Sequence, residues 1–201
     1  MRNTLIILLF FLAGLLAGIF AILPEAISGE QMTLYVLYLL LFLVGIGVGA
    51  NKQTLKLLRN VNLRIFLIPL SVILGTFLGT LVYSFFDDAL TLRECWAVGS
   101  GFGYYSLSSV LIKEIASESL GVLALLSNII REILTLLLAP VLSRLFGAFA
   151  PISSGGATSM DTTLPVITRS VGSEYAAVSV FSGLVLTLLV PLLVPLILQG
   201  G

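Results

Sequence analysis

Long apolar runs separated by short polar stretches dominate the pattern of residues along this chain. A run of about twenty apolar residues with few charges can cross the hydrocarbon layer of a bilayer, which is roughly 30 Å thick. Such runs occur at about 4–23, 33–50, 65–86, 119–146 and 173–198. The pattern therefore predicts an all-α polytopic membrane protein with about five full transmembrane helices.

Two further segments have the length of a membrane span but contain helix-breaking and polar residues. Residues 94–112, ECWAVGSGFGYYSLSSVLI, carry three glycines and then three serines, and residues 150–168 include GGATSMDTTLP. Backbone that leaves the helix inside lipid loses hydrogen bonds worth several kcal/mol per group, so it is tolerated only where protein or a water-filled cavity covers it. We therefore predict that both broken segments line a cavity.

The two broken segments also resemble each other. GFGYYSLSSVL (101–111) and GGATSMDTTLP (155–165) share the leading glycine, a pair of hydroxyl residues and the aliphatic residue that follows. This similarity predicts a repeated unit of one broken segment and one span, about 55 residues long, at 94–148 and again at 149–201. We expect the two units to form a transport core that follows a three-span bundle at 1–93 in the sequence.

The course of the broken segments decides how the two units are related. If each segment is re-entrant, entering and leaving on one side, each unit crosses the membrane once and the repeat is inverted, which is a common arrangement around transporter binding sites. If each segment crosses fully, the repeats are parallel. With re-entrant hairpins, Arg144 lies on the cytoplasmic side, as basic residues prefer, but Lys113 lies outside. The loop charges therefore leave both alternatives open.

Basic residues in the loops predict the orientation. The loop between the second and third spans contains Lys52, Lys56, Arg59 and Arg64, whereas the loops on either side of those two spans carry acidic residues. Cytoplasmic loops are enriched in lysine and arginine, so we expect this loop and the N-terminus to be cytoplasmic and the C-terminus to lie outside. The run at 4–23 is too long for the apolar part of a signal peptide, so we expect a retained first helix.

Composition excludes several other classes of protein. Hydrophobic residues make up 58% of the chain and charged residues 10%, against about 45–50% and 25% in soluble domains. The net charge is zero and no long block of one sign occurs, so no nucleic-acid partner is indicated. The chain has no histidine and a single cysteine, Cys95, so we expect neither a metal site nor a cofactor. No histidine or lysine base stands near a candidate nucleophilic serine, so we do not expect an enzyme.

Charged residues inside the apolar segments point to a transport site. Such a charge near the bilayer centre costs on the order of 3 kcal/mol on insertion scales and usually marks an ion or substrate path. Asp161 lies in the second broken segment, and Arg131 and Glu132 lie near the middle of the span at 119–146. We expect Glu132 or Asp161 to bind a cation or carry protons. The alternative is that Arg131 pairs with an acid and only holds helices together.

Other polar positions are candidates for substrate binding. Half-helix N-termini expose N–H groups that suit a carboxylate, and tyrosine rings bind alkyl chains or ammonium groups. The alternatives are close packing of small residues, tyrosines in an interfacial belt and anchoring of a helix end by Glu114. The candidates are Gly101, Gly103, Tyr104, Tyr105, Ser106, Ser108, Glu114, Asn128, Arg131, Gly156, Thr158, Ser159 and Thr162.

Four stretches together resemble the lysine exporter family of prokaryotes, the LysO type: LLLFLVGIGVGANKQTLK, GSGFGYYSLSS, NIIREIL and GGATSMDTTLPVITRS. The resemblance covers essentially the whole chain. It implies export of L-lysine and toxic analogues such as thialysine across the cell membrane in exchange for protons, with Glu132 and Asp161 as the intramembrane acids. One departure is Asn128, because family members often have aspartate at this position.

The resemblance also bears on partners. The long form of the family has about three more membrane segments ahead of the region matched here, and broken helices must be shielded from lipid on all sides. We therefore expect either a small membrane subunit that supplies the missing helices or a homodimer, which forms readily by two-fold symmetry. The alternative function is that of a non-transporting or pore-type membrane subunit of a larger complex.

Overall fold

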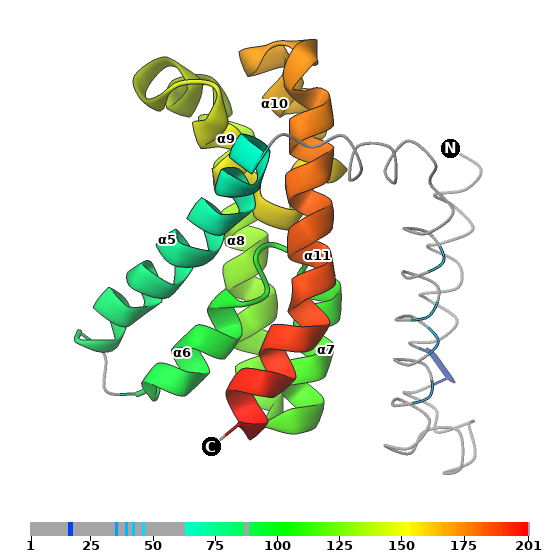
Figure 1. Cartoon of the computed structure of the whole chain (residues 1–201). Helices are drawn as coiled ribbons and strands as arrows, with labels where there is room; N and C mark the ends of the chain where they lie inside the picture. The colour runs from blue at the N-terminus through cyan, green and yellow to red at the C-terminus, as the bar shows by residue number, and fades with distance from the viewer. Residues whose placement is uncertain are drawn as a thin grey trace. The chain divides into compact units, whose positions relative to one another are not determined.

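The computed structural model describes residues 63–86 and 89–200, together with six single residues nearer the N-terminus (Figure 1). By packing, the chain divides into two compact units, Met1–Gly47 and Val48–Gly201, and the fold described here is that of the second unit. The predicted spans 4–23 and 33–50 lie almost wholly outside the described residues. The predicted boundary between residues 93 and 94 stays a prediction.

The described residues are helical apart from short connections and include no strand, which confirms the all-α fold class. Three helices are long and apolar enough to cross a membrane: α5 (Leu67–Ser84), α8 (Glu118–Phe146) and α11 (Ala176–Gln199). They correspond to the predicted spans at 65–86, 119–146 and 173–198. Two short 3-10 helices, η1 (Leu63–Phe66) and η3 (Ser173–Tyr175), precede α5 and α11. The full number of spans stays a prediction.

Each predicted broken segment consists of short helices joined by an irregular turn. The first contains α6 (Leu92–Gly99) and α7 (Tyr105–Ile115), and the second contains α9 (Phe149–Gly155), the 3-10 helix η2 (Gly156–Met160) and α10 (Leu164–Val171). In Figure 1, α6 and α7 lie together in one half of the unit, whereas α9 and α10 lie in the other half. This is the arrangement that two re-entrant hairpins require. Re-entry relative to a bilayer stays a prediction.

The local sequence explains where these short helices begin and end. Thr91 caps α6 and exchanges hydrogen bonds with Glu94, which forms a capping box. The turn that follows contains Phe102 at φ +46° and Gly103 at φ +100°, and the second turn contains Gly156 at φ +59°. A right-handed helix needs negative φ values, so the chain cannot continue as a helix through either turn, and glycine at 103 and 156 adopts the positive values readily.

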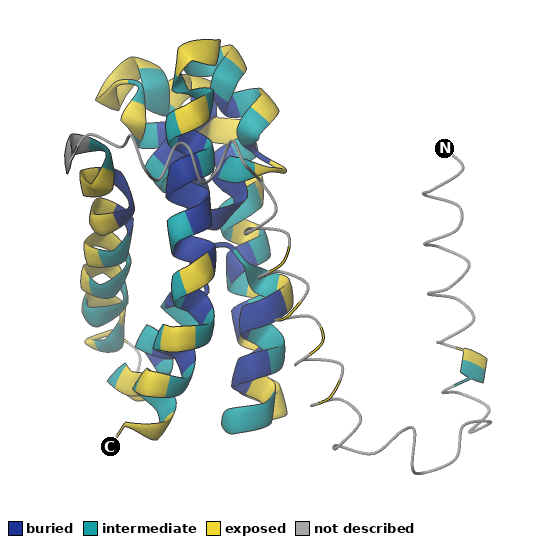
Figure 2. Ribbon diagram, turned by 45° about the vertical axis from the view of Figure 1, so that its right-hand side comes forward, coloured by how far each residue is buried: buried dark blue, intermediate teal, exposed yellow. Residues whose placement is uncertain are grey.

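Burial is concentrated where the turns meet the long helices. Phe102 and Leu186 are fully buried, and Phe181 is almost so. The inner face of α11 is buried along most of its length, whereas the outer face of α5 is exposed and apolar (Figure 2). An exposed apolar face on a helix of this length is typical of contact with lipid. The core of the unit is therefore assembled around the two broken segments.

Candidate functional site

The two irregular turns meet each other through their main chains. The N–H group of Ala157 donates a hydrogen bond of 2.8 Å to the carbonyl oxygen of Phe102. A Cβ atom on Gly156 would collide with the same carbonyl oxygen, and a Cβ atom on Gly103 would lie 3.0 Å from the carbonyl oxygen of Gly155. Glycine at both positions therefore lets the two backbones touch. We call this contact between residues 102–103 and 155–157 the crossing.

Asn128 of α8 supports the first turn. Its Oδ1 atom accepts a hydrogen bond of 2.7 Å from the N–H group of Gly103, and its Nδ2 atom donates one of 2.8 Å to the carbonyl oxygen of Ala124. The side chain is buried. A buried N–H group without a partner costs about 1–3 kcal/mol, so Asn128 stabilises the first turn directly.

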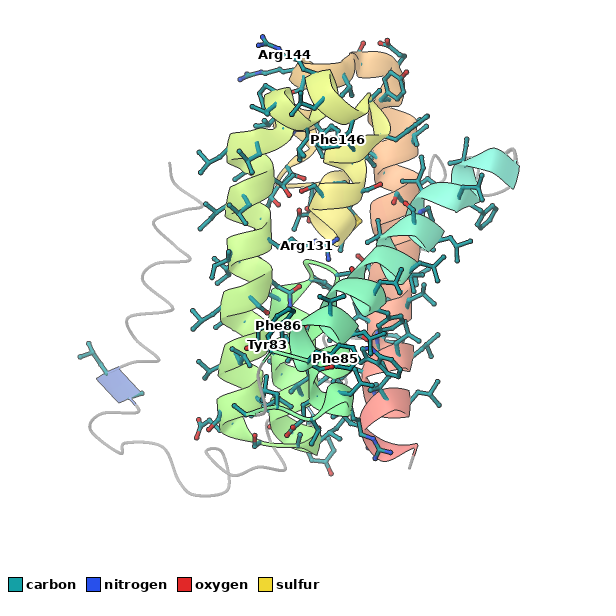
Figure 3. All side chains as sticks on the ribbon, turned by 90° about the vertical axis from the view of Figure 1, so that its left-hand side faces the viewer. Tyr83, Phe85, Phe86, Arg131, Arg144 and Phe146 are labelled. Carbon is teal, nitrogen blue, oxygen red and sulfur yellow. The ribbon has the colours of Figure 1, made fainter. Side chains whose placement is uncertain are left out.

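Arg131 lies one turn further along α8 and supports the second turn. Its Nε atom donates a hydrogen bond of 2.9 Å to the carbonyl oxygen of Ser154, and its Nη2 atom donates one of 3.1 Å to that of Ser153. Figure 3 shows Arg131 at mid-height, beside the tip of α9. In the described ranges the only ion pair joins Lys113 to Glu118 at 3.2 Å. The alternative in which Arg131 pairs with an acid is therefore not observed there.

Two hydroxyl side chains in the second turn bind the main chain. Thr158 Oγ1 donates to the carbonyl oxygen of Gly155 at 2.9 Å, and Ser159 Oγ lies 2.7 Å from the carbonyl oxygen of Gly156 and 3.0 Å from that of Ser179. Both residues are buried. These hydroxyl groups replace hydrogen bonds that the broken helix has lost. A role for them in substrate binding stays a prediction.

The two acids predicted to bind a cation or carry protons lie in different elements, Glu132 within α8 and Asp161 at the end of η2. Asp161 is exposed, and its Oδ1 atom accepts a hydrogen bond of 2.6 Å from the N–H group of Thr162. Glu132 is half-buried and forms no hydrogen bond or ion pair with any residue that the structure describes. The charges of both carboxyl groups act on the Tyr105 hydroxyl, and that of Asp161 also acts on Tyr104. Tyr105 is the first residue of α7 and marks one end of that helix.

That end of α7 is its N-terminus. The helix begins at Tyr105 without a side-chain cap, so the N–H groups of its first turn lack partners within the helix. Ser106 is exposed there, whereas Ser108 is buried and its hydroxyl has no hydrogen-bond partner within the described part of the chain. A Cβ atom on Gly101 would lie 2.6 Å from Ser108 Oγ and from Asn128 Nδ2. Polar groups and a helix terminus thus converge beside the crossing.

Most of the predicted site residues lie beside the crossing, but Glu114 does not. Glu114 lies near the other end of α7, roughly 14 Å along the helix axis from Tyr105. Sequence reasoning missed Gly183 of α11, where a Cβ atom would lie 2.7 Å from the carbonyl oxygen of Ala157. The repeat of about 55 residues contained a signal for it, because Gly183 corresponds to Asn128 in the first unit.

Comparison with known proteins identifies the family. The model of the family described as "Lysine exporter LysO" matches residues 8–198. The chain belongs to the LysO family. Lysine exporter LysO of Escherichia coli K12 is 38% identical over 160 residues, which cover 80% of this chain and 52% of that protein. A provisionally named lysine exporter of Haemophilus influenzae is 37% identical over 162 residues, which cover 80% of each chain.

The LysO comparison thus confirms the resemblance noted in the sequence. The chain spans about half the length of the Escherichia coli relative and about four fifths of the Haemophilus influenzae relative. No solved structure matches it. Family membership and the three long apolar helices together show a multi-pass protein embedded in a membrane.

Proposed function

We propose that this chain exports L-lysine and toxic analogues such as thialysine across the cell membrane of a prokaryote, in exchange for protons. The observation that carries the proposal is that the two broken segments meet beside the uncapped N-terminus of α7, with Asp161 exposed after the second turn. Glu132 follows Arg131 on α8, and Arg131 hydrogen-bonds the second turn. Carboxyl groups on both sides of this turn suit a substrate with a positively charged side chain. The names of the relatives, both lysine exporters, support the same substrate class.

The residues around the crossing have different roles in the proposed function. Asn128 and Arg131 hydrogen-bond the broken backbone, so their polar groups are needed for the fold. Glu132 has no such partner in the described ranges and is the group available to a cation. A lysine molecule would place its carboxylate at the N–H groups of the first turn of α7 and its ammonium groups at Glu132 and Asp161. Protonation of these acids would release the cation, which couples export to proton entry.

The test is lysine flux in liposomes that contain the purified full chain. Vesicles loaded with radiolabelled lysine should lose it faster when a proton gradient is directed inward. Glu132→Gln and Asp161→Asn should insert normally and lose this acceleration, because each keeps the side-chain shape and removes the titratable group. Glu118→Gln is the matched control, since Glu118 is an exposed acid at the start of the same helix.

Three results would contradict the proposal. The first is wild-type flux in both neutralised variants. The second is flux that neither saturates with lysine nor responds to the gradient, which would indicate a pore. The third is no lysine flux at all.

The expected partner and orientation stay predictions. A small membrane subunit or a second copy of this chain would shield the broken segments from lipid, and the mass of the purified particle in lipid nanodiscs distinguishes a monomer from a homodimer. The cytoplasmic N-terminus and external C-terminus are tested by the side from which single cysteines react.

A further inference from the structure

The C-terminal end of α9 lies inside the unit, where its carbonyl groups need donors. The last carbonyl groups of a helix have no N–H partner within it and carry its partial negative charge. In a continued helix the N–H group of Ala157 would reach Ser153, but here it binds Phe102 instead. Arg131 fills this gap, because its guanidinium donates to the carbonyl oxygens of both Ser153 and Ser154.

A cavity of about 330 Å³ adjoins the guanidinium, between α5, α8 and α9. Its polar groups are hydroxyl and carbonyl oxygens. Arg131 Nη1 lies 3.4 Å from Thr76 Oγ1, and Ser71 Oγ lies 3.4 Å from Ser153 Oγ. No acidic residue lines the cavity among the residues described. Within the described part of the chain, the positive charge is therefore held here by neutral oxygen atoms alone.

Neutral oxygen atoms at the end of a broken helix are the ligands that bind cations in transporters of this general design. We propose that the end of α9 is a monovalent-cation site and that the guanidinium of Arg131 is its resident cation. Because this cation is tethered, it does not dissociate, and the second turn keeps its structure without any ion from solution. Removal of the side chain opens the site to a free cation, and a small guanidinium compound fits best. The inference does not depend on which substrate is transported.

The experiment measures chemical rescue of stability in the purified full chain. Cys95 is the single cysteine and is buried, so its reaction with a fluorogenic thiol reagent reports thermal unfolding. Wild type, Arg131→Ala and Arg144→Ala are compared in choline chloride, with methylguanidinium chloride or sodium chloride replacing it at constant ionic strength. Arg144 is the matched control, because it is an exposed arginine near the end of the same helix.

Arg131→Ala should unfold at a lower temperature in choline, and millimolar methylguanidinium should raise the midpoint in a saturable way. At ten times its dissociation constant the ligand raises the ratio of folded to unfolded protein about tenfold. Wild type and Arg144→Ala should not respond. A wild-type midpoint in Arg131→Ala, or equal midpoints in methylguanidinium, sodium and choline, would overturn the proposal.

If Arg131→Ala does not fold, two more variants test whether the positive charge stabilises the end of α9. Arg131→Lys keeps a cation at the site, whereas Arg131→Gln keeps a hydrogen-bond donor without the charge. Arg131→Lys should be the more stable of the two and should not respond to added cations. If Arg131→Gln is as stable as Arg131→Lys, or more stable, hydrogen bonding alone holds α9 and the cation site is refuted.

Discussion

Replacement of Gly156 by alanine should break the crossing. Gly156 has φ +59° and ψ −125°, a conformation that side chains other than glycine rarely adopt. Its new Cβ atom would collide with the carbonyl oxygen of Phe102 and lie 3.2 Å from Arg131 Nη2. The carbonyl group belongs to the other turn, so the two turns must separate. Their shared hydrogen bond from Ala157 to Phe102 is lost when they do.

Two costs add up in Gly156→Ala. The backbone conformation costs a residue other than glycine about 1–3 kcal/mol. Loss of a hydrogen bond between buried groups costs about 1–3 kcal/mol more. For a chain of about this size, 1 kcal/mol shifts the unfolding midpoint by about 2–4 °C. The second cost alone therefore corresponds to roughly 2–12 °C.

Gly147→Ala separates these two costs. Gly147 also has a positive φ, +84°, but a Cβ atom there would have no atom within 4 Å. It should show only the backbone cost. We expect Gly156→Ala to unfold at a lower temperature than Gly147→Ala and to transport lysine more slowly. The measurements are thermal unfolding followed by thiol labelling of Cys95 and lysine flux in liposomes. Equal midpoints for the two variants would refute the claim that the crossing stabilises the unit.

Two further predictions concern Asn128, which supports the first turn, and the path of the two broken segments relative to the membrane. Asn128→Ala should lower the free energy of unfolding by about 1–3 kcal/mol, because a buried N–H group loses its acceptor, whereas Asn128→Asp keeps that acceptor and should lose less; equal losses in the same thermal assay would contradict the role of Oδ1. Single cysteines at Arg93 and Lys113, exposed residues near the ends of α6 and α7 that lie away from the crossing, should react with a membrane-impermeant reagent from one side of the membrane, and one at Arg169, exposed near the end of α10, from the other side. All three are made in a background without the native cysteine. Reaction at Arg93 and Lys113 from different sides, or at all three positions from one side, would exclude hairpins that open in opposite directions.

The positions of the breaks were predictable because the signal is local. Glycine and hydroxyl residues inside an apolar run disfavour a continuous helix, and the turns at Gly103 and Gly156 lie inside the predicted segments. Glu132 and Asp161 are conspicuous for a similar reason, since each is an ionisable residue in an apolar segment, and their role with cations or protons stays a prediction.

The partners of the polar residues were not predictable. Arg131 was considered as a substrate ligand or as half of an ion pair, but it binds main-chain carbonyl groups. The sequence offers Asn128 as a candidate for substrate binding, whereas in the structure it binds a main-chain N–H group. Every residue has main-chain N–H or carbonyl groups, so the sequence carries no mark of which ones a helix break leaves without partners. Only the tertiary fold shows them.

The bond between Ala157 and Phe102 joins main-chain atoms of two hairpins that lie in opposite halves of the unit. Asn128 and Arg131 attach both turns to α8 as well, so hydrogen bonds join the two turns to each other and to this helix. In the lysine exporter that we propose, this joined centre would stay fixed as a pivot. Surrounding helices would tilt about it and open the acids to one side of the membrane and then to the other.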